Sequence, residues 1–390
     1  MCKDGWQNLL MPQTNYRPLA NDHLFVLYAV VNETLKGKQG CCIDLVFTDV
    51  TDCFNSLWTE KTVLDLHENG IETNLLNLIY ELSKSANISI KTPVGITEKK
   101  SIEDIIKQGE TLSSISCTST MDRISKESKK ETFKYRKSVQ IPKMGYIDDL
   151  LDVNKCGNPI KEQHDFTTNE LNKRKLQTNF DKSGRMHIRN KRDSCPEGKC
   201  KELKVDKWKV HKREEGENAC LEDKYEGKVP IKTVKNYLYL GNIIEFDGSN
   251  NLTIKERVAK GQGASKEILH ILEEVYFGEK FIDAFKLLRN SKLISILSYN
   301  IEVIHGLTKR DIQCLDKIDV VLARKVLKLS SRSTRCLILL ELQLIPIEFI
   351  IKSKRINYLR TVLTSSDSSL VKVVLKNSGK IQFKVILQLL

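Results

Sequence analysis

The hydrophobic residues of this chain recur with two different periods, and the change between them divides the sequence near residue 250. Before that point, short apolar runs typical of strands alternate with segments in which apolar residues recur every three or four positions. The predicted strands are Cys41 to Thr51, Asn87 to Lys91, the two arms of Gln140 to Val153, and Asn236 to Glu245. The predicted helices are Leu24 to Leu35, Thr59 to His67 and Glu72 to Ser83. From Thr253 onward the pattern is helical, and Thr308 to Asp311 resembles a capping box.

Acidic residues interrupt two of the predicted strands. Asp49 ends one apolar run, and Asp148-Asp149 occupies the tip of a predicted hairpin. Like-charge repulsion and partial desolvation oppose an acidic pair in such a place, and a divalent cation would offset both. If the hairpin lies beside the Asp49 strand, the carboxylates meet at one end of a sheet and could hold two Mg²⁺ ions about 4 Å apart. Taken alone, Asp148-Asp149 also fits an ordinary turn, because Asp is a turn residue.

Four short motifs occur in order along the chain. They are Phe47-Thr-Asp-Val-Thr-Asp-Cys-Phe54, Gln108-Gly109, Tyr146-Ile-Asp-Asp149 and Tyr239-Leu-Gly241. Together they resemble the palm of reverse transcriptases, specifically those of LINE-type (non-LTR) retrotransposons. The resemblance extends over about residues 20–375.

The resemblance implies a role for the residues of two motifs. Asp49 corresponds to the metal-binding aspartate of motif A. Tyr146, Asp148 and Asp149 correspond to the Tyr-x-Asp-Asp box of motif C, so that Asp49 and Asp148 would bridge both metal ions and Asp149 would assist. Phe54 corresponds to the aromatic residue that stacks under the sugar and selects dNTPs over rNTPs.

The remaining matches concern nucleotide, template and primer. Gln108 and Gly109 look like motif B, which contacts the nascent base pair and the template. Lys182 stands at the spacing of the motif D lysine, which can act as a general acid toward pyrophosphate. Tyr239-Leu240-Gly241 resembles the primer-grip hairpin. Thr111 replaces the proline usual in motif B. Because a fingers subdomain and an endonuclease normally precede motif A in this family, we expect a copy that is truncated at its N-terminus.

The composition and the charge are consistent with a folded protein that binds nucleic acid. Apolar residues make up 40% and charged residues 29% of the 390 residues, and no apolar run is long enough to span a membrane. The net charge of +13 is concentrated in two basic segments, Arg123 to Lys143 and Lys182 to Arg213, which suits binding to a phosphate backbone. Solvated loops are the alternative explanation for this charge.

The cysteines indicate a reducing environment. Eleven of them are scattered without a regular framework, so we expect an intracellular protein, in the nucleus or the cytoplasm. Cys195 and Cys200, with Cys156, Cys220 or His211, could bind zinc, although free thiols in a loop are the favoured interpretation. Cys41-Cys42, next to the first strand, is interpreted as packing.

We therefore expect an α+β fold: a polymerase palm, with an antiparallel sheet, helices and a central Tyr146 to Asp149 hairpin, followed by an all-helical thumb and C-terminal region. The expected domains are 1–40, a remnant of fingers; 41–184, the palm with motifs A to D; 185–235, a basic insertion or loop; 236–250, a primer-grip-like hairpin; and 251–390, the thumb and C-terminal region.

The expected function is RNA-directed DNA polymerase activity, with Mg²⁺ (or Mn²⁺) as cofactor. The partners would be an RNA template, a DNA primer and dNTPs, with no membrane and no prediction of oligomeric state. Because no complete fingers subdomain is recognised before motif A, the sequence does not decide whether the chain is an active enzyme. The alternative is a catalytically inactive, decayed or co-opted retrotransposon fragment that binds RNA. A purely structural helical scaffold ranks last, since it leaves Asp49 and Asp149 unexplained.

Overall fold

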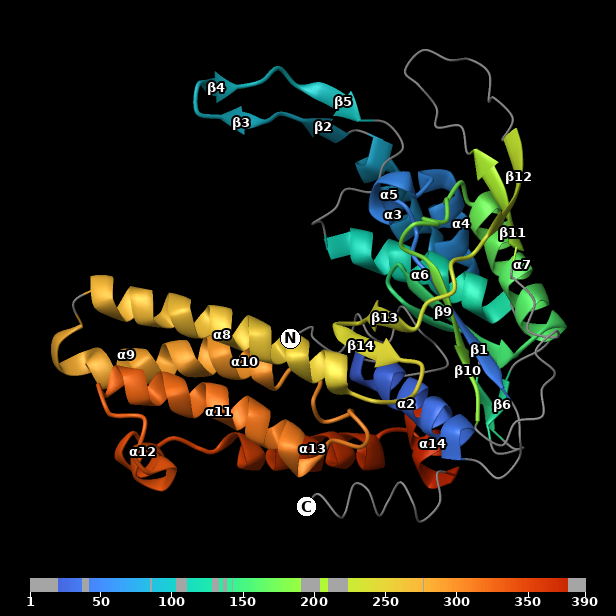
Figure 1. Cartoon of the computed structure of the whole chain (residues 1–390). Helices are drawn as coiled ribbons and strands as arrows, with labels where there is room; N and C mark the ends of the chain where they lie inside the picture. Colours follow the sequence, from blue (N-terminus) through green and yellow to red (C-terminus); the bar gives the residue numbers. More distant parts are fainter. Residues whose placement is uncertain are drawn as a thin grey trace. The chain divides into compact units, whose positions relative to one another are not determined.

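The computed structural model describes residues 20–36, 42–84, 86–102, 111–127, 133–135, 139–141, 143–190, 204–209, 224–275 and 277–377. The chain divides into two compact units (Figure 1). Unit 1 contains Met1–Arg17 and Lys36–Lys235, and unit 2 contains Pro18–Leu35 and Asn236–Leu390.

An antiparallel four-stranded sheet forms the centre of unit 1. Its strands are β1 (Ile43–Thr48), β8 (Met144–Tyr146), β9 (Asp149–Lys155) and β10 (Gly184–Ile188), in the order β10-β1-β9-β8. All six residues of β1 are buried, as expected for an apolar strand with neighbours on both sides. The β8–β9 hairpin is therefore not central as a whole, because β9 lies inside the sheet whereas β8 lies at its edge.

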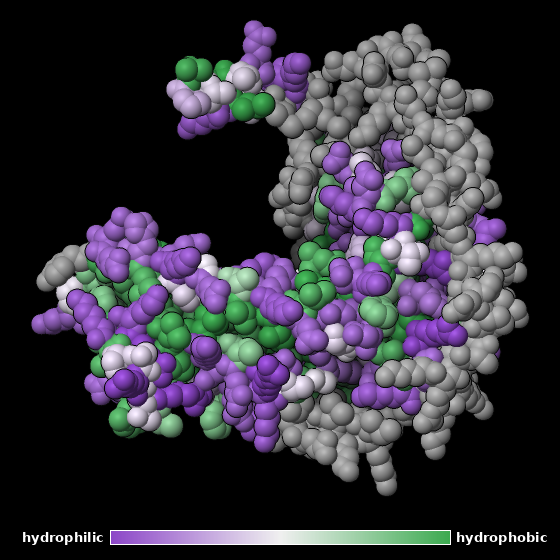
Figure 2. Space-filling view, viewed as in Figure 1, coloured by the Kyte–Doolittle hydropathy of each residue, from purple (hydrophilic) through white to green (hydrophobic). Residues whose placement is uncertain are grey.

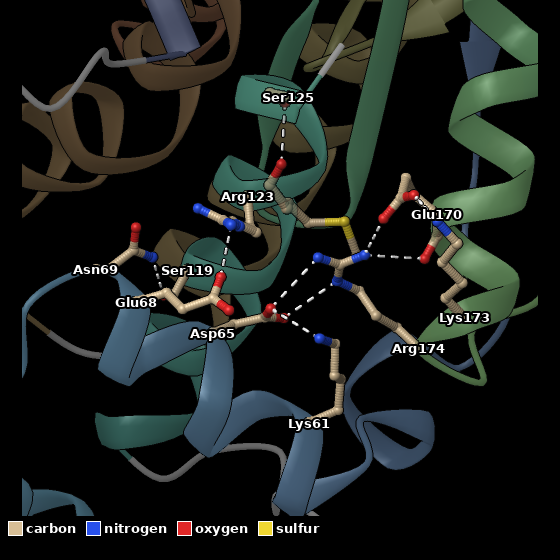
Figure 3. A network of polar contacts seen from close by, with 11 residues as sticks. Lys61, Asp65, Glu68, Asn69, Ser119, Arg123, Ser125, Glu170, Lys173 and Arg174 are labelled. Carbon is tan, nitrogen blue, oxygen red and sulfur yellow. Dashed lines mark hydrogen bonds and ion pairs between the residues drawn. The ribbon is translucent and has the colours of Figure 1, made fainter.

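Helices pack on this sheet and on one another. They are α3 (Cys53–Ser56), α4 (Thr59–Glu68), α5 (Thr73–Lys84), α6 (Thr111–Glu127) and α7 (Asn158–Lys173). Helix α6 contacts β8 and α4, and α7 contacts β9. An ion-pair network joins these helices (Figure 3): Asp65 of α4 accepts hydrogen bonds from Arg174 at 3.1 and 3.3 Å, and Arg174 also binds Glu170 at 2.6 Å. Salt bridges of this kind fix helices α4 and α7 against each other.

Short hairpins complete unit 1. Their strands are β2 (Ala86–Ile88) with β5 (Lys100–Ile102), β3 (Lys91–Thr92) with β4 (Gly95–Ile96), β6 (Phe133–Tyr135) with β7 (Val139–Ile141), and β11 (Lys204–Lys209) with β12 (Lys224–Pro230). The β3–β4 hairpin exposes apolar side chains at its tip, visible as green atoms in Figure 2; Val94 is 97% exposed and Ile96 71%.

The range 185–235, expected to be a basic insertion or loop, begins with a regular strand. Residues 184–188 form β10, which pairs with β1 along its whole length. Strand β10 carries Arg185 and His187. Because these side chains are polar, the segment lacks the apolar pattern by which a strand is predicted from sequence. Both bind the buried Asp44 of β1, at 2.6 and 2.9 Å, and the buried guanidinium of Arg185 forms an ion pair with this carboxylate.

Unit 2 is a helical assembly with one hairpin. Its elements are α2 (Ala20–Lys36, of which Ala20 to Leu35 belong to unit 2), β13 (Asn236–Tyr239), β14 (Asn242–Glu245), α8 (Asn251–Glu274), η1 (Gly278–Lys280), α9 (Phe281–Leu288), the π-helix η2 (Arg289–Ile294), α10 (Ser295–Leu297), α11 (Lys309–Val326), α12 (Arg335–Glu341), α13 (Ile347–Thr364) and α14 (Leu370–Asn377). The capping box predicted at Thr308 is confirmed, since the side chains of Thr308 and Asp311 each bind the other residue's backbone.

Two further contacts hold unit 2 together. The buried Arg289 binds Asp319 of α11 at 2.7 and 2.5 Å, which fixes the π-helix to α11. In α2, Asp22 accepts a hydrogen bond from Tyr358 of α13 at 2.9 Å. Helix α2, which falls inside the predicted fingers remnant, thus groups with the C-terminal helices; the predicted domain boundaries stay a prediction. No helix within the described residues is both long and apolar enough to cross a membrane.

Candidate active site

Strand pairing brings the three aspartates of the sequence motifs to one end of the sheet. Strands β1 and β9 pair from Ile43 opposite Lys155 to Thr48 opposite Leu150. Asp49 directly follows Thr48 and Asp149 directly precedes Leu150, so both aspartates lie at this end of the β1–β9 pair. Asp148 lies in the turn immediately before Asp149, so the Tyr-x-Asp-Asp hairpin lies beside the Asp49 strand, as the sequence motifs require.

The turn that carries Asp148 is strained. Tyr146 pairs with Asp149, which leaves Ile147 and Asp148 as a two-residue turn. Ile147 has φ 57°, in the left-handed region that β-branched residues avoid, at a cost of about 1–3 kcal/mol. Its side chain packs against a buried apolar cluster that includes Leu150 and Met121 of α6. Packing against this cluster opposes relaxation of the turn.

The carboxylates repel one another electrostatically. Burial, together with the neighbouring charges of Asp148 and Asp49, raises the pKa of Asp149 to about 6. Burial also raises the pKa of Asp49, with Asp148 adding to the effect, whereas Lys182 and a hydrogen bond from Asn179 oppose it. The charge of Asp148 is thus close enough to destabilise the ionised forms of both Asp49 and Asp149.

The loop that carries Lys182 is bound to the backbone of Asp49. The backbone N–H of Asn179 donates to the Asp49 carbonyl at 2.9 Å, and the Asp49 N–H donates to Oγ of Ser183 at 3.1 Å. The Lys182 N–H in turn donates to Oδ1 of Asn179 at 3.3 Å. The side chain of Lys182 is exposed. This local structure places Lys182 next to the aspartates and is the physical basis of its effect on the pKa of Asp49.

Phe54 lies five residues after Asp49 in the sequence, on the short helix α3. The chain enters α3 through Asp52, which has φ 42°. The partly buried ring of Phe54 packs against the same apolar cluster as Ile147, together with Val50 of the motif A segment. Motif A and motif C thus share one supporting cluster.

The motif B residues Gln108 and Gly109 lie outside the described residues, as do Cys195, Cys200, His211 and Cys220, the alternative zinc ligands. Helix α6 begins at Thr111, and its buried face reaches the hairpin. A Cβ placed on Gly145 of β8 would lie 3.2 Å from the Leu150 side chain and 3.4 Å from Oγ of Ser125 on α6, so α6 packs tightly on this strand.

Tyr239, Leu240 and Gly241 belong to unit 2, in the β13–β14 hairpin. Leu240 and Gly241 form its two-residue turn, with φ 47° and 76°. Tyr239 is buried, and the Leu240 carbonyl accepts a hydrogen bond from Asn300 at 3.2 Å. A Cβ on Gly241 would lie only 2.6 Å from the ring of Tyr299, so glycine is required at this turn for space as well as for φ.

A buried polar cluster behind the hairpin is the feature that sequence analysis missed. Lys143, directly before β8, binds Asp152 of β9 at 2.9 Å, and both side chains are fully buried. His164 and Thr167 of α7 bind Asp152 at 3.2 and 3.1 Å, and Lys143 also binds Thr167. Although burial opposes its charge, Lys143 and His164 hold the pKa of Asp152 below its usual range. The signal was present in the sequence as an acid within Leu150-Leu-Asp-Val153.

The two basic segments are partly neutralised inside unit 1. Arg123 binds Glu68 at 2.6 Å, Lys143 binds Asp152, and Arg185 binds Asp44. Figure 3 shows Arg123 directed toward Glu68. The charge available to a phosphate backbone is therefore smaller than the residue count suggests.

Among the described residues, no group of three or more His, Cys, Asp and Glu side chains is positioned as a metal-binding cluster. The donor set nevertheless fits a hard divalent cation, since Asp49, Asp148 and Asp149 supply only oxygen ligands. Burial, and secondarily the charge of Asp148, raises the pKa values of Asp49 and Asp149, and a bound cation would offset both effects.

The comparison with known families identifies the family to which this fold and its three aspartates belong. The family described as reverse transcriptase (RNA-dependent DNA polymerase) matches residues 3–244. The chain belongs to this family. Its α+β class, a palm with an antiparallel sheet followed by a helical region, is as predicted.

Similar solved structures include two telomerases in complex with a TWJ fragment of telomeric RNA. The Candida tropicalis protein shares 11% identity at a TM-score of 0.45, over 99% of this chain and 54% of that one. The Candida albicans protein shares 14% identity at a TM-score of 0.31, over 85% and 50%. The chain thus spans about half the length of these telomerases. No curated protein sequence matches it.

Proposed function

We propose that this chain is an RNA-directed DNA polymerase that adds dNTPs to a primer 3′-hydroxyl on an RNA template. The observation that supports this proposal best is that β1 and β9 pair up to Thr48 opposite Leu150, which brings Asp49 and the Asp148-Asp149 turn to the same end of the sheet in a member of the reverse transcriptase family. The function includes divalent-metal chemistry: Mg²⁺ or Mn²⁺ would lower the charge of the attacking and leaving oxygens.

Each residue of the site has a proposed task. Asp49 and Asp148 hold the cations, and Asp149 assists them. Lys182, held beside Asp49 by the loop hydrogen bonds, donates a proton to the leaving pyrophosphate. Phe54 packs under the sugar and selects dNTPs.

The remaining proposed tasks concern template and primer. Gln108 and Gly109 contact the nascent base pair, Tyr146 contacts the primer, and Tyr239-Leu240-Gly241 forms a primer grip. The rigid hairpin geometry of Leu240 and Gly241 supports the last assignment, because a fixed turn presents its backbone groups in one orientation. We also propose that the chain derives from a LINE-type (non-LTR) retrotransposon.

Primer extension tests the proposal. The full chain is incubated with an oligo-dT primer on poly-rA, dTTP and Mg²⁺, in parallel with Asp148→Asn and with Asp283→Asn, an exposed position of α9 that serves as a charge-matched control. We expect extension by the wild type and the control. The Asp148→Asn rate should fall by about 10²-fold or more, because loss of a metal ligand removes several kcal/mol of transition-state stabilisation.

The competing hypothesis predicts a different result. A catalytically inactive fragment would bind poly-rA in a filter-binding assay and extend no primer with either Mg²⁺ or Mn²⁺. Equal rates for the wild type and Asp148→Asn would show that any extension comes from a contaminating polymerase.

A further inference from the structure

Two cysteines face each other at the end of the palm sheet that lies away from the aspartates. The register that pairs Ile43 with Lys155 continues to Cys42 opposite Cys156, at the start of β1 and the end of β9. Their Sγ atoms lie 2.6 Å apart. The six residues of β1 separate Cys42 from Asp49, so the two positions lie roughly 23 Å apart along an extended strand.

We propose that Cys42 and Cys156 form a reversible disulfide in exchange with glutathione, a modification site on the palm. Antiparallel neighbours already place the two sulfurs in contact, so closing the bond requires little movement of the backbone. Cys156 is half-buried, at the turn before α7, and so is accessible to a small disulfide, whereas Cys42 is only 4% exposed.

The exchange proceeds in two balanced steps. The Cys156 thiolate attacks one sulfur of glutathione disulfide, forming a mixed disulfide and releasing one glutathione thiolate. The Cys42 thiolate then attacks Sγ of Cys156, forming the protein disulfide and releasing the second glutathione. Each released thiolate takes up a proton; the two cysteines are oxidised and glutathione disulfide is reduced.

A second cysteine pair in unit 1 provides an internal comparison. Sγ of Cys53 and Sγ of Cys117 lie 3.2 Å apart on α3 and α6, but the two residues are 3% and 0% exposed. Their mutual hydrogen bond and burial raise the pKa of Cys53, so its thiol stays protonated. A pair with no accessible thiolate cannot start the exchange.

The test maps disulfides by mass spectrometry after the full chain is equilibrated with glutathione disulfide, alkylated and digested. We expect a peptide that links Cys42 to Cys156 and none that links Cys53 to Cys117. In Cys42→Ser, Cys156 should be trapped as the mixed disulfide with glutathione; in Cys156→Ser, Cys42 should remain a free thiol. The oxidised wild type should melt at least about 3 °C above the reduced form, since the bond closes a long loop, and Cys42→Ser should show no such rise.

Two results would overturn the proposal. One is a wild type in which Cys156 accumulates as the mixed disulfide without the linked peptide, because Cys42 would then be out of reach. The other is Cys156 left unmodified while the exposed Cys314 and Cys336 react, because Cys156 would then be inaccessible. Neither result depends on polymerase activity.

Discussion

At the scale of single residues, the site is defined by Asp149, whose pKa is raised to about 6 by burial and by the neighbouring aspartates. In the unfolded chain a carboxyl of this kind titrates near about 3.9. Between these two values the folded state binds more protons than the unfolded state, so Asp149 lowers the free energy of unfolding as the pH rises through that window. The ionised site is thus a source of instability that a bound cation would relieve.

This sign leads to a prediction for Asp149→Asn in EDTA. The free energy of unfolding of the variant, relative to the wild type, should be higher at pH 7 than at pH 4. The difference should be about 1–2 kcal/mol, less than the full pKa shift implies because the group is partly exposed. Urea unfolding at the two pH values measures it, with Asp283→Asn as control. A relative stability independent of pH would show that Asp149 is not destabilised when ionised, and saturating Mg²⁺ should reduce the difference.

Ile147 shows what could not be predicted at this scale. The sequence motif predicts a turn at Asp148, and the structure has one, but the left-handed φ of Ile147 depends on packing against residues of α6 that follow motif B. Intrinsic preference argues against this conformation for a β-branched residue. Only tertiary contacts make it tolerable, and these are invisible in a local pattern.

At the scale of elements, the buried cluster of Lys143, Asp152, His164 and Thr167 anchors the β8–β9 hairpin to α7. Asp152 lies on β9, three residues beyond Asp149, and Lys143 directly precedes β8. Lys143 and Asp152 are oppositely charged and fully buried. Removing either one leaves the other as an unpaired buried charge, which strongly destabilises a fold.

Lys143→Met is therefore expected to lower the free energy of unfolding by about 3–5 kcal/mol. Asp152→Asn should also destabilise, and the double variant should lose clearly less than the sum of the two single losses. Urea unfolding of the four proteins gives the coupling energy. As a control, Lys260→Met removes an exposed lysine that pairs with the half-buried Glu256 on α8, and it should cost less than about 0.5 kcal/mol. Additive losses would mean that Lys143 and Asp152 contribute independently.

The elements that could be predicted are those whose pattern is local. Helices α4 and α5 and the β8–β9 hairpin follow from apolar periodicity and turn residues, and the capping box at Thr308 from residue identity. Strand β10 could not be predicted, because the sequence Gly-Arg-Met-His-Ile reads as polar. It becomes a strand because Asp44, 141 residues away, neutralises Arg185. Long-range charge pairing of this kind has no local signal.

At the scale of the whole molecule, the net charge of +13 suggests a nucleic-acid partner, but ion pairs within unit 1 already use part of it. Affinity for a single-stranded nucleic acid falls with salt according to the number of phosphates neutralised, at about 0.7 logarithmic units per contact. Exposed lysines contribute to this slope fully, whereas a cation already held by a carboxylate contributes little.

Two variants in the first basic segment separate these cases. Lys134 of β6 is exposed, whereas Arg123 of α6 binds Glu68 at 2.6 Å. If the β6 hairpin contacts RNA, Lys134→Gln should reduce the slope of log Kobs against log salt by about 0.7, while Arg123→Gln, which removes the same formal charge, should leave it nearly unchanged. Fluorescence anisotropy with labelled poly-rA across a salt series measures both slopes. Equal reductions would mean that the Glu68 pair opens on binding, and no reduction in either variant would place the RNA interface elsewhere on the chain.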